Sequence, residues 1–150
     1  MPNAAIDAAL AREDTLEIKG ASDSDYVQIP GVTTLSKTTN NEVQTWFTYD
    51  DPYSNSSITG KGMEIAVEGV VYKNNAAQRK LLDLEEKVGT EANIDFRYTD
   101  GSLGFVYTGT AAVEITSAGG APTDNKTFSA TLHVKGEPTK TQASSTQTNP

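Results

Sequence analysis

The feature that most constrains the fold of this chain is an alternation of apolar and polar residues that recurs from residue 26 to residue 135. A period of two is typical of β-strands that place one face in a core and the other in solvent. The clearest example is residues 63–72, where Met63, Ile65 and Val67 alternate with polar or small residues. The sequence therefore predicts a mainly β protein.

Other segments show the same pattern and are predicted strands: residues 26–35, 43–49, 91–99, 103–116 and 127–135. Pro30-Gly31 should bend the first of them. Asp100-Gly101 is a strong signal for a tight turn between the strands on either side of it.

One stretch follows helical spacing instead, and it lies between the strands at 63–72 and 91–99. Asn75 is suited to the N-cap position, with Gln78 where a capping partner would lie, and Gly89 could end the helix in a left-handed conformation. Its predicted apolar face consists of Ala77, Leu81, Leu84 and Val88.

These elements predict a β-sandwich or barrel of about six to eight strands with one flanking helix. We expect the folded domain to span residues 26–136. Residues 1–25 are alanine-rich and acidic and are interpreted as a flexible N-terminal arm, and residues 137–150 are interpreted as a disordered tail, because they hold almost no apolar residue.

Residues 50–61 join two predicted strands and are expected to form a long polar loop that is disordered in the monomer. Tyr53 and Ile58 are apolar residues that would have no partner in a solvated loop. We therefore predict that the loop becomes ordered on contact with another subunit.

Composition excludes several classes of protein. Asp and Glu outnumber Lys and Arg by 20 to 12, for a formal net charge of -8, which argues against a nucleic-acid-binding module. The absence of cysteine excludes disulfides and thiolate chemistry. No apolar run approaches the roughly 20 residues of a membrane span, and the first residues do not resemble a secretory signal, so we expect synthesis in a cytoplasm and no membrane insertion.

The sequence shows no catalytic or metal-binding pattern. His133 is the sole histidine and is expected on the solvent side of its strand, without a nucleophile motif. The Asp pairs near residues 23–25 and 50–51 lack the spacing of a calcium loop and are typical of turns. We therefore expect no enzyme activity and no cofactor.

From residue 27 to residue 138 the chain resembles the major tail tube proteins of long-tailed, lambda-like bacteriophages. The resemblance rests on the order and spacing of segments, beginning with Val-Gln-Ile-Pro-Gly-Val at 27–32, Gln-Thr-Trp-Phe at 44–47 and Gly-Lys-Gly-Met-Glu-Ile-Ala-Val-Glu-Gly at 60–69. It continues through the helix at 77–84, the strands at 94–102 and 105–111, and the closing segment at 128–138.

The resemblance implies a tail-tube fold, which the secretion-tube protein of type VI systems shares, and a subunit that stacks as hexameric rings around a lumen. It implies location in the virion tail, partners such as a tape measure protein and tail-end proteins, and passage of DNA without specific binding.

Within this hypothesis, two sets of residues receive roles. The acidic residues opposite the apolar strand faces are candidates for the lumen wall: Glu64, Glu68, Glu91 and Asp95. The expected loop supplies candidates for contacts between rings: Asp50, Asp51, Tyr53, Ile58 and Lys61.

The alternative function is a soluble β-sandwich that binds carbohydrate or a cell-wall ligand. Such a module would gather exposed aromatic residues on one face. In this sequence the tyrosines are scattered over many elements, which favours the assembly hypothesis.

Overall fold

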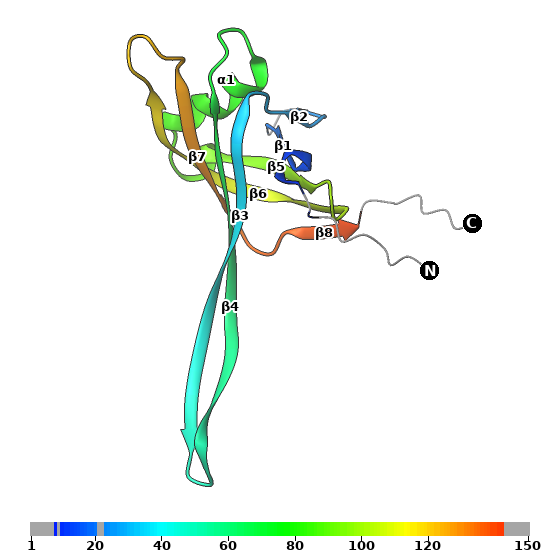
Figure 1. The fold of residues 1–150 in the computed structure, drawn as a ribbon, viewed down its shortest axis with the longest axis vertical. Coiled ribbons are helices and arrows are strands. Elements are labelled where there is room, and N and C mark those ends of the chain that lie inside the picture. The colour runs from blue at the N-terminus through cyan, green and yellow to red at the C-terminus, as the bar shows by residue number, and fades with distance from the viewer. Residues whose placement is uncertain (1–7, 9, 21–22, 143–150) are drawn as a thin grey trace, which may run out of the picture.

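In the computed structural model, which describes residues 8, 10–20 and 23–142, eight β-strands form one antiparallel sheet (Figure 1). The strand order is β2-β1-β5-β6-β7-β4-β3, and β8 also pairs with β6. The strands are β1 (Thr15–Lys19), β2 (Val27–Gln28), β3 (Val32–Thr48), β4 (Asp51–Val70), β5 (Asn93–Asp100), β6 (Phe105–Gly119), β7 (Thr127–Val134) and β8 (Thr139–Gln142).

The helical elements are short: α1 (Ala76–Leu82) and the 3-10 helices η1 (Ala11–Glu13), η2 (Asp83–Glu86) and η3 (Gly89–Ala92). The prediction of a mainly β fold with one flanking helix is confirmed, and the strand number lies within the expected range. The β-structure is continuous, since a single sheet carries all the strands.

The core lies on one face of this sheet and consists of the apolar positions that alternate along its strands. In β7, for example, Phe128, Ala130 and Leu132 are buried while the residues between them are more exposed. The core cluster also takes Ile94, Phe96 and Tyr98 from β5, Ala111 and Val113 from β6, Ile65 and Val67 from β4, and Leu81 from α1.

The expected N-terminal boundary at residue 26 is wrong. Strand β1 pairs with β5 along its whole length, and Leu16 and Ile18 are fully buried members of the core. A strand of five residues between polar segments shows too few alternations to be recognised in the sequence. In the structure, its two apolar side chains are buried and the other three are partly exposed. Residues 1–7, 9, 21 and 22 of the expected flexible arm lie outside the described residues.

The expected tail also begins too early, because residues 139–142 form β8 and pair with β6. All four residues of β8 are exposed, so backbone pairing rather than burial defines the strand. Residues 143–150 of the expected tail lie outside the described residues.

The N-cap of the helix is confirmed, since the Asn75 side chain accepts a hydrogen bond of 2.9 Å from the backbone N–H of Gln78. The Gln78 side chain is buried, and its hydrogen bonds go to residues outside the helix. Its amide group donates to the carbonyls of Pro30 and Val70 and accepts from the backbone N–H of Tyr72. It therefore joins α1 to the chain segments at both β3 and β4.

The predicted apolar face holds only for the first part of the helix. Ala77 and Leu81 are buried and Leu84 packs partly against the core, but Val88 is 82% exposed. The α-helix ends at Leu82 and the chain continues in 3-10 turns, so helical spacing no longer applies at residue 88. Gly89 does have a positive φ of 64°, in the turn that begins η3.

The largest departure from the sequence-based expectation is a long hairpin formed by β3 and β4. The two strands pair from Val32↔Gly69 out to Thr48↔Asp51, with irregularities on the way. Only the part of β4 from Glu64 onward also pairs with β7. Beyond it, residues 40–62 project from the body as an isolated two-stranded ribbon, here called the arm (Figure 1).

The expectation of a disordered loop at residues 50–61 is therefore wrong, because this segment is a strand. Its Ser, Thr and Asn residues show no apolar alternation since neither face of the arm is buried by the chain itself. Pro52 is tolerated because it lies at the very start of β4, next to the turn.

Candidate functional site: a polar sheet face and a projecting arm

The face of the sheet opposite the core is polar across neighbouring strands. Register places Glu17 of β1 beside Arg97 of β5, and it places His133 of β7 beside Glu64 of β4. We call this surface the polar face. It consists of Glu17, Lys19, Asp95, Arg97, Thr108, Thr110, Glu114, Ser129, Thr131, His133, Glu64 and Glu68, all at positions that alternate with core residues.

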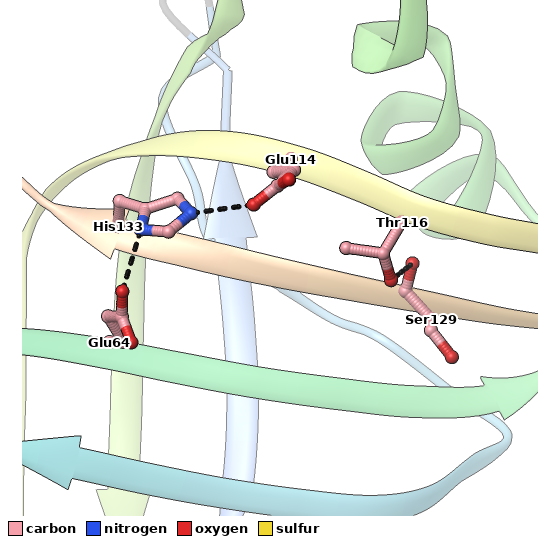
Figure 2. A network of polar contacts seen from close by, with 5 residues as sticks. All are labelled: Glu64, Glu114, Thr116, Ser129 and His133. Atoms are coloured by element: carbon pink, nitrogen blue, oxygen red, sulfur yellow. Dashed lines mark hydrogen bonds and ion pairs between the residues drawn. The ribbon is translucent and has the colours of Figure 1, made fainter.

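His133 lies between two carboxylates on this face (Figure 2). Its Nδ1 is 3.0 Å from Oε1 of Glu64, and its Nε2 is 2.8 Å from Oε1 of Glu114. Both nitrogens can donate only when the imidazole is protonated. The hydrogen bond with Glu114 is the main cause that raises the pKa of His133, assisted by the charge of Glu64 and opposed by desolvation.

This cluster links three strands, β4, β7 and β6, through side chains. The sequence correctly predicted that His133 faces away from the core, but its two partners come from distant segments. Figure 2 also shows that Thr116 of β6 donates a hydrogen bond of 3.1 Å to the carbonyl of Ser129 in β7, beside the irregularity in their pairing.

The other end of the polar face is also cross-linked. Arg97 donates two hydrogen bonds, of 2.9 and 2.7 Å, to the carboxylate of Glu17. Thr110 donates one of 2.8 Å to Asp95. The hydrogen bond with Glu17 is the main cause that raises the pKa of Arg97. These contacts hold several charged groups in place on a face whose carboxylates outnumber its cations.

Three of the four candidates for a lumen wall lie on the polar face: Glu64, Glu68 and Asp95. Glu91 does not lie on a strand, and the expectation that it continues the alternation is wrong. Strand β5 begins at Asn93, and Glu91 is an exposed residue of η3. Whether the polar face lines a lumen stays a prediction.

The arm carries the largest group of exposed apolar side chains. Val43 pairs with Ile58 across the arm, and Trp46 pairs with Asn55, so apolar side chains occur on both of its faces. The exposed set on the arm consists of Val43, Trp46, Phe47, Tyr49, Tyr53 and Ile58. Exposed apolar surface of this kind is found where proteins bind other proteins, membranes or ligands.

The candidates for contacts between rings occupy different parts of the arm. Asp50, Asp51 and Tyr53 lie at the tip, where the Asp51 carboxylate accepts a hydrogen bond of 2.9 Å from the backbone N–H of Tyr53. A hydrogen bond with Thr48 is the main cause that lowers the pKa of Asp50. Ile58 lies halfway along the arm and Lys61 lies at its base.

The described part of the chain contains no cluster of three or more His, Asp or Glu side chains arranged to hold a metal ion. Among the same residues, no helix has the length and apolar character needed to cross a membrane.

No family model and no curated protein matches this sequence. Solved structures do match its fold. A chain in the tail of an empty gene transfer agent particle, refined with C6 symmetry, has a TM-score of 0.68 and 14% identity over 89% of this chain and 99% of its own. The SPP1 tail tube gives a TM-score of 0.68 and 14% identity over 90% of this chain and 80% of its own.

A chain in the sheath–tube complex of the extracellular contractile injection system PVC is also similar, with a TM-score of 0.61 and 9% identity over 91% of this chain and 93% of its own. The fold is therefore that of phage tail tube and injection-system tube proteins.

Proposed function

We propose that this chain is a structural subunit that polymerises as stacked hexameric rings into a phage tail tube, the conduit for DNA ejection. The observation that carries the proposal is the match in fold to the C6-symmetric gene transfer agent tail and the SPP1 tail tube, which extends over 89% and 90% of this chain. A match of that extent covers nearly all of the described sheet rather than a common core motif.

The arm supports self-association. Two-stranded ribbons are marginally stable in water on their own. This one also exposes aromatic side chains on both faces, as Trp46 and Phe47 illustrate. A second subunit that packs against the arm would bury these side chains and stabilise the ribbon.

The polar face supports the role of lumen wall. Glu64, Glu68 and Asp95 lie there among Thr and Ser residues, and the carboxylates of the face outnumber its cations, Lys19, Arg97 and His133. Negative charge on a conduit wall repels phosphates and would keep passing DNA from binding.

The proposal places the protein in the virion tail and assigns it no catalytic role. The alternative of a glycan-binding module finds no support in the three similar structures described above, which are named as a particle tail, a tail tube and a sheath–tube complex. Tape measure and tail-end proteins are proposed partners on the basis of the assembly alone.

Electron microscopy of the purified protein at increasing concentration tests the proposal. We expect hollow tubes built from sixfold rings, with an axial repeat set by one ring. A protein that stays monomeric at high concentration, or that forms only compact particles without a lumen, contradicts the proposal.

A further inference from the structure

The tip of the arm is acidic and aromatic. Asp50 and Asp51 lie side by side at the turn, flanked by Tyr49 and Tyr53, which are 112% and 79% exposed. Among the described residues, no Lys, Arg or His lies within 4.0 Å of either carboxylate. The tip therefore combines negative charge with apolar surface, and its carboxylates have no cationic partner within the described chain.

A cleft of about 590 Å³ lies at the opposite end of the arm, where β3 and β4 leave the body. Strand β6 contributes Tyr107 to its wall, and the segment after β7 contributes Pro138. The cleft is basic, because Lys37, Lys61 and Lys140 line it together with only one carboxylate, that of Glu137.

Two of the three lysines of this cleft, Lys37 and Lys140, lie over aromatic rings. The Lys37 ammonium lies 3.9 Å from the centroid of Tyr107, and that of Lys140 lies 4.1 Å from the centroid of Phe105. Lys37 is the main cause that lowers the pKa of Tyr107, which reflects the positive potential in the cleft. Within the described part of the chain, no carboxylate lies within 4.0 Å of any of the three ammonium groups.

The cleft thus holds three lysines without a carboxylate partner in a chain whose formal net charge is -8. Positive potential in a cleft with an aromatic wall suits an acidic segment that also carries aromatic side chains. The arm tip matches this description.

The tip and the cleft of one chain cannot meet. The strand rise of about 3.3 Å per residue separates them by about 30 Å along the paired strands of the arm. Their complementarity can therefore be satisfied only between two copies. A contact between different surfaces of identical subunits is heterologous, so it joins copies into a ring or an open filament and not into a closed dimer.

We propose that the arm tip of one copy, with Asp50, Asp51 and the flanking tyrosines, docks into the basic cleft of a second copy, where Lys37, Lys61 and Lys140 receive it. This inference rests on the proposed function and specifies the contact by which subunits join along the tube. The distance from tip to cleft then sets the spacing between successive copies.

Charge exchange provides the test. A tip variant carries Asp50→Lys and Asp51→Lys, and a cleft variant carries Lys61→Glu and Lys140→Glu. Lys61 and Lys140 are exposed, so their replacement should leave the monomer folded. Each variant alone should raise the concentration needed for polymerisation about tenfold or more, because like charges now face each other. Circular dichroism and thermal melting establish that each monomer is folded.

Equal amounts of the two variants, when mixed, should polymerise again. The basic tip of the first variant meets the acidic cleft of the second, and the acidic tip of the second meets the basic cleft of the first. The result is a copolymer in which the two variants alternate. A chain carrying all four substitutions should also recover polymerisation.

The variant with Asp50→Asn and Asp51→Asn serves as a check on the turn, because asparagine can still accept the hydrogen bond from Tyr53. It should weaken polymerisation less than the lysine variant does. Glu85→Lys with Glu86→Lys makes the same change of charge at exposed positions of η2 and should leave polymerisation close to that of the wild type.

The outcome that overturns the inference is a pair of folded variants that each polymerise normally, or that fail alone and fail equally in the mixture. Failure of the wild-type chain to form tubes at any concentration would instead count against the proposed function itself. Tubes from the wild type together with no effect of charge exchange would reject the docking contact alone.

Discussion

The body and the arm of this protein use the same two strands in different ways. In the body, β4 alternates strictly, with Ile65 and Val67 fully buried and the residues between them more exposed. In the arm, residues 52–59 of the same strand are all exposed. A period of two thus marks a strand that buries one face, and it is lost where a strand has no core to cover.

The comparison also separates two sources of stability. Apolar residues of the body stabilise the monomer because their side chains are buried away from water when it folds. Arm residues can contribute in this way only when a second subunit covers them. Substitutions in the body should therefore lower the free energy of unfolding of the monomer, whereas matched substitutions in the arm should act on assembly.

The largest difference is expected for aromatic residues. Phe96→Ala in the core should lower the free energy of unfolding by about 3–5 kcal/mol, because it removes a fully buried ring. Phe47→Ala in the arm should change it by less than about 0.5 kcal/mol, yet it should weaken polymerisation. Urea denaturation of the monomer and sedimentation of polymer measure the two effects. Equal destabilisation by both variants would mean that the arm is part of the monomer core.

Aliphatic residues give a second matched pair. Leu81→Ala should lower the free energy of unfolding by about 2–5 kcal/mol, because its side chain is fully buried between α1 and the sheet. Ile58→Ala, at an arm position that is 55% exposed, should have a much smaller effect on the monomer. A change of only about a few tenths of a kcal/mol in the free energy of unfolding for Leu81→Ala would show that α1 does not pack against the sheet.

A polar pair tests the buried hydrogen bonds of Gln78. Gln78→Ala removes the buried side chain that bonds to two partly buried carbonyls and one N–H, and it should lower the free energy of unfolding by about 1–3 kcal/mol. Gln44→Ala, on the exposed arm, should be nearly neutral. Chemical denaturation of both variants is the measurement, and a neutral Gln78→Ala would indicate that water replaces its contacts.

The smallest effect concerns pH. The pKa of His133 is raised above 6.5 in the folded protein, so its contribution to stability is complete below that pH and is lost as pH rises through the folded pKa. The cluster is partly exposed, so the change should be only about a few tenths of a kcal/mol.

His133→Gln should remove this dependence while leaving stability near its high-pH value. Denaturation midpoints across the neutral range, with and without the substitution, measure it. A wild type whose stability increases over the same range would contradict the sign. Arm variants should leave the dependence intact, since His133 is the sole histidine.

Several features of this protein follow from the sequence by itself. The strands around residues 63–70, 105–116 and 127–134 are predictable because each buries alternate side chains. Their apolar residues therefore recur at every second position of the sequence. The Asn75 cap was predictable for a similar reason, because it bonds to a backbone group three residues away.

Other features depend on partners that are distant in the sequence. Leu16 is a core residue only because β1 pairs with β5, and residues 51–61 form a strand only because β3 lies beside them. His133 joins Glu64 and Glu114 through a register of three strands that no local pattern contains. Strand pairing is non-local, so only the tertiary structure decides which polar residues meet, where the arm projects and which surfaces remain for a second copy.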